Sequence, residues 1–202
     1  MKKTLLSGLA TGVFIFGMMG SANAASFTFD GNITYHNDII QIGFTLDSDA
    51  TDVRVWTDSF WDATNFDPIT AVWAASGSGY SIVGENDDDD TIASGQTSYD
   101  SGLTFASLSA GDYLFTIATY DNFAVGTTLS EGFAYDSETP ILMANWAQPA
   151  SHQGMGTYYR VNLDGVDGAS NNSDVPEPAT VLLFGTGLLC LVGYSRKRGQ
   201  KS

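Results

Sequence analysis

Four consecutive aspartates, Asp87 to Asp90, are the densest group of potential metal ligands in the chain, and Asn86 precedes them directly. Calcium binds six to eight oxygen atoms in flexible geometry, and adjacent carboxylates repel one another unless a cation or water separates them. The run therefore suggests a calcium site. Its candidate ligands are Asn86, Asp87, Asp88, Asp89, Asp90 and Asp67. The alternative is a solvated acidic loop, because the glycine and the distal glutamate of an EF-hand do not follow.

Asp67 lies directly before Pro68, and an aspartate in this position commonly organises a turn through its own backbone contacts. We expect Asp67 to order the bend that starts a strand over residues 69–75. Metal ligation is its alternative role. Calcium is the only cofactor that the residue types suggest.

Aromatic side chains are crowded between residues 56 and 73, and core packing accounts for most of them. Phe60 and Trp61, however, lie in a turn-like segment rather than in clear alternation. Because aromatic rings beside carboxylates suit carbohydrate recognition, Trp56, Phe60 and Trp61 are candidate stacking residues for a sugar. The ligand would be the exopolysaccharide of the producing cell.

The sequence has no G-x-S-x-G motif, no H-E-x-x-H motif and no phosphate-binding glycine loop. The two histidines, His36 and His152, stand in polar, loop-like contexts and are expected to be solvated. The single cysteine, Cys190, lies in an apolar segment near the C-terminus, so no disulfide is expected. We therefore predict no enzymatic activity, with a hydrolase based on a carboxylate pair as an alternative.

Patterns of period two dominate the middle of the chain and predict β-strands. The alternating positions are Ile40, Ile42, Phe44 and Leu46, then Tyr113, Phe115, Ile117 and Thr119, then Tyr159, Val161 and Leu163. Turns rich in glycine and aspartate separate these runs, and no long stretch keeps a helical period. We predict an all-β fold with eight to ten strands, a jelly-roll-like β-sandwich over residues 25–164, and a flexible linker over residues 165–174. Tyr113 is expected to pack at a strand start, as corner tyrosines do.

The N-terminus has the order of a secretory signal peptide over residues 1–24. Two lysines precede an apolar run, and a small-residue stretch closes with Ala22-Asn23-Ala24. Cleavage is expected between Ala24 and Ala25. The alternative is a retained transmembrane helix, but the run is shorter than the roughly 20 residues that a stable span needs.

The C-terminal end combines a proline motif, an apolar segment and a basic tail. Val175-Pro176-Glu177-Pro178 precedes the apolar residues 179–195, and the tail over residues 196–201 contains Arg196, Lys197 and Arg198. The prolines favour extended backbone at the residues before them. The basic side chains can reach the lipid headgroups and favour the cytoplasm. We expect one short transmembrane helix with the rest of the mature chain outside.

This order of elements over residues 175–198 resembles the PEP-CTERM sorting signal. The resemblance implies a substrate of exosortase, a membrane transpeptidase-like enzyme of bacteria that make exopolysaccharide. It also implies export, transient anchoring in the inner membrane, and a final place on the cell surface or in the extracellular matrix of a Gram-negative bacterium. The expected partners are signal peptidase and exosortase as processing enzymes.

A second resemblance covers the body of the chain. Its motifs are, in order, Phe66-Asp67-Pro68, Gly84-Glu85-Asn86-Asp87-Asp88, Ala110-Gly111-Asp112-Tyr113 and Tyr120-Asp121-Asn122. They resemble the Phe-Asp-Pro family of PEP-CTERM proteins and the β-sandwich modules of the pre-peptidase C-terminal type. The resemblance implies a binding or accessory domain without chemistry of its own.

Charge is distributed unevenly along the chain, whose net charge is −15. All 23 acidic residues lie between Asp30 and Glu177, where Arg54 and Arg160 are the only fixed cations, so this stretch carries −21. Such a body repels nucleic acid and favours divalent cations. The preferred function is a non-catalytic surface or matrix protein. The alternatives are a calcium-dependent carbohydrate-binding module and a secreted hydrolase.

Overall fold

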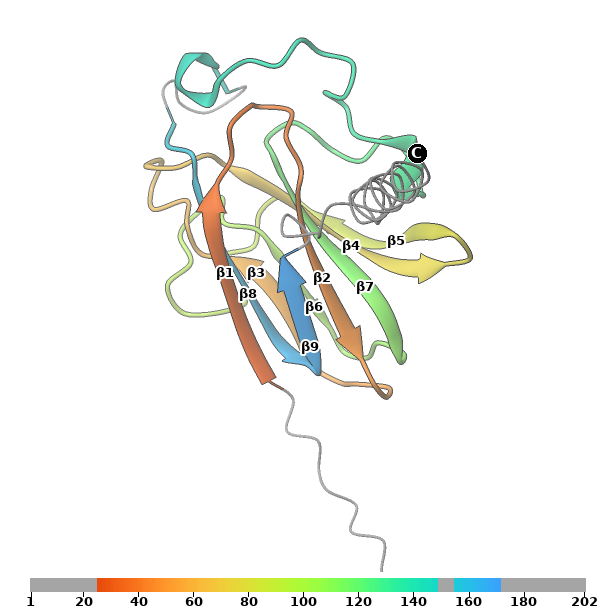
Figure 1. Cartoon of the computed structure of the whole chain (residues 1–202). Helices are drawn as coiled ribbons and strands as arrows, with labels where there is room; N and C mark the ends of the chain where they lie inside the picture. Colours follow the sequence, from red (N-terminus) through yellow and green to blue (C-terminus); the bar gives the residue numbers. More distant parts are fainter. Residues whose placement is uncertain (1–24, 149–154, 172–202) are drawn as a thin grey trace, which may run out of the picture.

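A computed structural model of the chain describes residues 25–148 and 155–171 (Figure 1). These residues form nine β-strands and two short 3-10 helices. The strands are β1 (Ala25–Asn32), β2 (Ile40–Leu46), β3 (Val53–Thr57), β4 (Pro68–Ser76), β5 (Gly79–Asn86), β6 (Gly102–Phe105), β7 (Gly111–Thr119), β8 (Tyr158–Val166) and β9 (Gly168–Asn171). The helices η1 (Leu129–Glu131) and η2 (Met143–Asn145) lie between β7 and β8. No helix in this part of the chain is long and apolar enough to cross a membrane.

The strands form two antiparallel sheets that share one hydrophobic core. The order is β1-β8-β3-β6 in the four-stranded sheet and β5-β4-β7-β2-β9 in the five-stranded sheet. Val55 and Leu163 of the first sheet belong to the same buried cluster as Ile42 and Phe115 of the second. The predicted all-β architecture with two sheets is confirmed.

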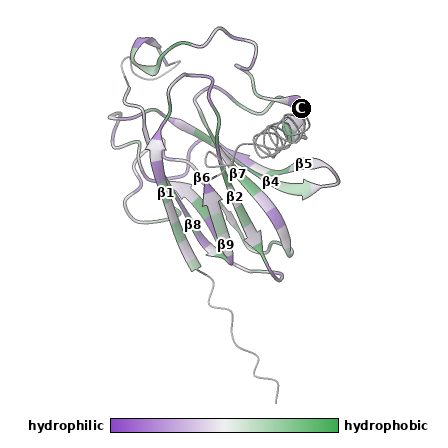
Figure 2. Cartoon of the chain, in the orientation of Figure 1, coloured by the Kyte–Doolittle hydropathy of each residue, from purple (hydrophilic) through white to green (hydrophobic). Residues whose placement is uncertain are grey.

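Buried and more exposed residues alternate along the strands with a period of two. In β2 the four predicted core positions are buried and the three residues between them are more exposed. Figure 2 shows the same alternation of hydrophobic and paler or hydrophilic positions along several strands. The hydrophobic effect thus fixes which face of each strand meets the core.

The central strands β4 and β7 are instead buried on both faces. One face meets the main core. On the other face, Trp73 packs with Leu114 and Phe133 in a second, smaller cluster, and its indole nitrogen donates a hydrogen bond of 2.9 Å to Thr116 Oγ1. Phe133 follows η1, so the segment after β7 covers the middle of the sheet.

The C-terminal boundary of the domain differs from the prediction. Residues 165–171 were expected to belong to a linker, yet β8 continues to Val166, and β9 pairs with β2 at the edge of the five-stranded sheet. Gly165 adopts a positive φ of 83°, which suits glycine. An edge strand pairs through its backbone, so small polar side chains suffice and leave no periodic signal. The predicted signal peptide, residues 172–174 of the predicted linker, the C-terminal sorting segment and the basic tail lie outside the described residues.

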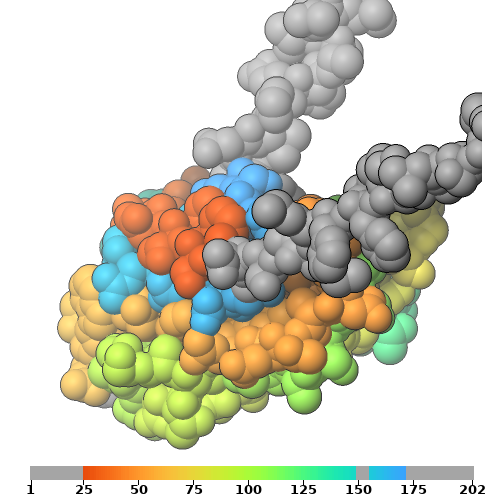
Figure 3. All heavy atoms as spheres, turned by 90° about the horizontal axis from the view of Figure 1, so that it is seen from below, coloured from red at the N-terminus to blue at the C-terminus, as the bar shows by residue number. Residues whose placement is uncertain are grey.

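Two turns meet at the end of the molecule seen in Figure 3. The segment between β2 and β3 (orange) lies beside the segment between β6 and β7 (green), and Ala50 and Leu108 exchange two backbone hydrogen bonds of 2.9 Å. Tyr113 is buried near this end, and its hydroxyl donates a hydrogen bond of 2.7 Å to the carbonyl of Ser109. The corner role expected of Tyr113 is confirmed.

Candidate metal centre

Acidic residues at the ends of three neighbouring strands lie together at one end of the five-stranded sheet. Because β4 runs antiparallel to β5 and to β7, its start lies beside their ends. Asp67 directly precedes β4, Asp87 directly follows β5, and Asp121 follows β7 after one intervening residue. Residues far apart in the sequence therefore reach the same end of the sheet.

Asp67, Asp87 and Asp88 form a compact cluster at this end. One carboxylate oxygen of each residue lies within 4.8 Å of those of the other two. The Asp67 side chain is buried, with only 5% of the residue exposed. The Oδ1 atoms of Asp67 and Asp87 are both buried without a hydrogen-bond partner. The predicted set of metal ligands is thus brought together in part.

The backbone of Asp67 fixes its place at the start of β4. Its amide donates a hydrogen bond of 3.2 Å to Gln148 Oε1, and its carbonyl accepts one of 2.8 Å from the amide of Tyr120. The strand begins at Pro68, close to the predicted start. These contacts hold the backbone in place, and one carboxylate oxygen of Asp67 lies in the cluster with those of Asp87 and Asp88.

Burial and mutual repulsion disfavour ionisation of the cluster. Burial raises the pKa of Asp67 to about 8, with further contributions from the negative charges of Asp87, Asp88 and Asp100. Burial and the charges of Asp88 and Asp121 raise the pKa of Asp87 to about 6. Burial, followed by the charge of Asp90, also raises the pKa of Asp88. These oxygens can be stabilised by protons or by a bound cation.

The other predicted ligands, Asn86, Asp89 and Asp90, do not belong to the cluster. The Asn86 amide nitrogen donates hydrogen bonds to the carbonyls of Asp88 and Gly102, at 3.3 and 3.0 Å. Asp89 Oδ1 accepts hydrogen bonds from the amide and hydroxyl of Thr91, at 2.9 and 2.6 Å. Asp90 is exposed. Asn86 and Asp89 therefore order the loop, while Asp87 and Asp88 face the cluster.

Sequence reasoning missed Asp100 and Asp121 as neighbours of the cluster. Asp100 is fully buried at the end of the loop that follows Asp90. Asp121 belongs to the motif Tyr120-Asp121-Asn122, whose position after a predicted strand was the available signal. Three of the four motifs of the body resemblance, those at residues 66–68, 84–88 and 120–122, lie at this one end.

The candidate sugar-stacking residues do not form one surface. Phe60 is only 2% exposed and belongs to the core, so its ring is not available to a ligand. Trp56 is half-buried, with the Arg54 guanidinium 5.8 Å from its ring centroid. Trp61 is 42% exposed and stacks on Tyr158 with ring centroids 5.3 Å apart. Only Trp61 of the three presents an exposed ring.

His36 is not solvated, contrary to the sequence-based expectation. It is completely buried beside the rings of Tyr135 and Trp146. Its Nδ1 accepts a hydrogen bond of 3.2 Å from the Ile141 amide, so Nε2 carries the proton and donates to Glu138 at 3.0 Å. The prediction failed because the short polar segment around His36 gave no sign of the aromatic residues that cover it. His152 lies outside the described residues.

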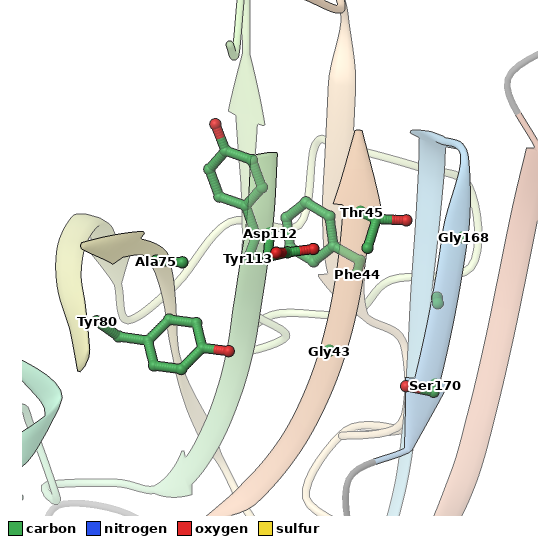
Figure 4. Close-up of a pocket in the computed structure, with 10 residues that line it drawn as sticks. Gly43, Phe44, Thr45, Ala75, Tyr80, Asp112, Tyr113, Gly168 and Ser170 are labelled. Carbon is green, nitrogen blue, oxygen red and sulfur yellow. The ribbon is translucent and has the colours of Figure 1, made fainter. Parts of the chain in front are cut away.

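A separate hollow of about 360 Å³ lies over the five-stranded sheet near β2, β5, β7 and β9 (Figure 4). Its side chains include Thr45, Tyr80 and Asp112, and Asp112 is the only carboxylate among the residues that line it. The hollow therefore lacks the pair of carboxylates that glycoside hydrolysis commonly uses. It shares no residue with the aspartate cluster.

Comparison with known proteins identifies the C-terminal segment. No curated protein matches the chain. The interpretation of the body as a Phe-Asp-Pro or pre-peptidase-like domain stays a prediction. Residues 174–198 match the family described as PEP-CTERM protein-sorting motif, a range that includes the Pro176-Glu177-Pro178 sequence. The chain therefore carries a PEP-CTERM sorting motif, which implies an exported protein that passes through a membrane-anchored stage and is processed by exosortase.

Proposed function

We propose that this chain is an exported, non-catalytic protein of the cell surface or extracellular matrix of a Gram-negative bacterium. The observation that carries the proposal is the sorting motif at residues 174–198. A signal peptide over residues 1–24 would direct export, and residues 179–195 would hold the chain in the inner membrane. Exosortase would then process the C-terminus, leaving the β-domain to act outside the cell.

Two features of the β-domain support a structural or binding role. His36 is sealed among aromatic rings with both ring nitrogens engaged, so it is not available as a general base. The hollow over the five-stranded sheet has Asp112 as its one carboxylate. A secreted hydrolase remains the third candidate, and it would require turnover that a single carboxylate substitution abolishes.

We infer that the β-domain is a jelly-roll sandwich. The first eight strands pair in a nested way: β1 with β8, β2 with β7, β3 with β6, and β4 with β5. This is the pairing of one long hairpin rolled into two sheets, and β9 is an addition beside β2. Lectin domains are among the proteins with this architecture, an analogy at the level of the fold alone.

The sorting proposal is tested by the intact mass of the mature protein from the envelope and medium of its host. We expect a chain that begins at Ala25 and ends near Pro176-Glu177-Pro178, with or without an attached group. The double variant Pro176→Ala/Pro178→Ala should retain the tail, whereas Asn172→Ala, outside the matched range, should be processed normally. A wild-type chain that continues to Ser202 would contradict processing.

Calcium-dependent binding of exopolysaccharide is the second candidate, and the exposed Trp61 ring favours it. Trp61, Asp62 and Ala63 have φ values of 50°, 52° and 70°, a left-handed conformation that is unfavourable for residues other than glycine. Strained backbone that holds an aromatic ring at the surface is typical of binding sites.

Affinity electrophoresis through the producer's exopolysaccharide tests this candidate. Trp61→Ala should abolish retardation of the protein, while Tyr35→Ala, another exposed aromatic, should preserve it. Equal retardation of both variants would exclude Trp61 as the sugar platform. Calcium and chelator are compared in parallel gels.

A further inference from the structure

The aspartate cluster at the shared end of β4 and β5 has the geometry of a cation site, and we propose that Asp67, Asp87 and Asp88 bind a calcium ion. The proposal does not depend on the sorting motif or on carbohydrate binding. It rests on buried oxygen atoms without partners, on the spacing of the carboxylates and on the distribution of charge.

The buried Oδ1 atom of Asp67 lacks the hydrogen-bond donor that a buried carboxylate oxygen normally has. Asp100 shows the usual solution in the same region: its two oxygens accept hydrogen bonds from Thr57, Ser59, Phe60 and Thr97. Asp67 is buried as well, yet its Oδ1 has no partner, and Asp87 Oδ1 shares this condition. Leaving such groups unpaired is costly, so a ligand for these oxygens is expected.

The spacing and chemistry of the cluster fit a hard cation. Two oxygens that each lie about 2.4 Å from a calcium ion are at most ~4.8 Å apart, and the three carboxylates meet this limit. All three ligands are carboxylates, whereas zinc and copper prefer histidine or cysteine.

The cluster is open to solvent on the side of Asp88. This exposed residue also lines a hollow of about 300 Å³ with Asp89, Asp90 and Tyr99. A calcium ion accepts water molecules readily, so waters in this hollow would complete its coordination. The hollow also provides the entry path that a metal site requires.

No positive side chain in the described residues neutralises the cluster. The two fixed cations of the described residues belong to the four-stranded sheet and form ion pairs there. Arg54 pairs with Asp164, and Arg160 pairs with Asp58 at 2.6 Å. Asp100 and Asp121 add negative charge near the cluster. The local field therefore attracts a cation from solution.

Calorimetric titration and thermal melting of the purified full-length chain test the proposal with calcium chloride, magnesium chloride and EDTA. Calcium at about 10 mM should raise the melting temperature by about 5 °C relative to EDTA, given an extracellular-type affinity. Magnesium should bind at least ~10-fold more weakly, because it requires shorter bonds and a stricter octahedral geometry. Equal affinity for both ions would overturn the assignment to calcium.

The variants Asp67→Asn and Asp88→Asn locate the ion. Each should weaken calcium binding at least ~10-fold, while the matched control Asp90→Asn in the same acidic run should stay within about threefold of wild type. Because Asp88 is exposed, its variant keeps the test valid if the buried Asp67 variant does not fold. Overlapping wild-type melting curves in calcium and EDTA, without heat of binding, would refute the site. Wild-type affinity in Asp88→Asn or in a folded Asp67→Asn would also refute it.

Discussion

Asp67 and Asp100 are buried aspartates at the same end of the molecule, but the protein stabilises them in different ways. Asp100 sits in a ring of hydroxyl and amide donors that fold the loop before β6 around it. Asp67 faces two other carboxylates. The hydrogen bonds of Asp100 hold the loop in place. The carboxylates around Asp67 repel one another when they are ionised, and a bound ligand can relieve this repulsion.

The raised pKa of Asp67 predicts how the metal-free protein responds to pH. The folded-state pKa is about 8 and the ordinary value of an aspartate is 3.8, so between these values the folded chain keeps a proton that the unfolded chain has lost. The stability contributed by this proton is fully present below about pH 4 and is lost as pH rises through about 8. In EDTA, Asp67→Asn should therefore gain stability relative to wild type between about pH 6 and pH 9.

Urea unfolding of both proteins at the two pH values measures this difference. Because the two proteins share the titratable groups outside the cluster, the comparison removes the contributions of those groups to the pH dependence. A stability difference that does not change with pH would show that Asp67 is ionised throughout the range.

The residue types in the sequence identified the candidate metal ligands, but they did not predict the directions in which the side chains point. Asp67, Asp87 and Asp88 were in the predicted set and meet in the structure. Asp89 was in the same run, but its carboxylate turns back to Thr91. The direction of each side chain in a loop depends on local hydrogen bonds, and composition does not encode them. Phe60 was likewise a reasonable surface candidate until tertiary packing placed it in the core.

At the scale of elements, β6 follows the acidic loop and pairs with β3 in the four-stranded sheet. Gly102 allows β6 to approach β3 closely. A Cβ atom at Gly102 would lie 2.5 Å from the Val55 carbonyl oxygen and 2.6 Å from Trp56 Cβ. The first of these is backbone that belongs to a paired strand and has little freedom to move.

Gly102→Ala should therefore destabilise the fold by about 2 kcal/mol, in the range of overpacking substitutions. The control is Gly79→Ala at the first residue of β5, where a Cβ would meet nothing within 4 Å. Its effect should stay within about 0.5 kcal/mol. Chemical denaturation of both variants measures the free energies, and similar losses would show that the contact at Gly102 relaxes.

The strands with strict alternation were predictable, and the others were not. Positions in β2 and β8 that were expected in the core are buried. The predicted face of β7 is buried too, but its other face is also covered, because the segment around Phe133 packs over it. β9 was missed because its residues are small and polar and pair only at an edge. Periodicity reports one buried face, whereas edges and covering loops depend on tertiary structure.

At the scale of the whole molecule, unbalanced negative charge opposes compact folding. The chain has 23 acidic and eight basic residues, and only two of the basic residues lie in the β-domain. The Arg54–Asp164 and Arg160–Asp58 pairs are partly exposed, so each contributes little. Self-repulsion among the remaining carboxylates should dominate the response to salt.

Sodium chloride should therefore stabilise the metal-free protein. Raising its concentration from about 0.02 M to about 0.5 M should increase the melting temperature by a few degrees, since the Debye length falls well below the size of the domain. Potassium chloride at the same ionic strength serves as the control and should have the same effect. A lower melting temperature in salt would show that the arginine pairs outweigh the repulsion.

The two cations of the β-domain are both arginines, and this has a practical consequence for labelling. No lysine occurs between Lys3 and Lys197. After signal cleavage, an amine-reactive dye could attach only to the new α-amino group at Ala25, the first residue of the edge strand β1, and to the two lysines of the tail. Once the tail is removed, a single amine remains. The stoichiometry of the dye on the secreted protein would thus count the processing events directly.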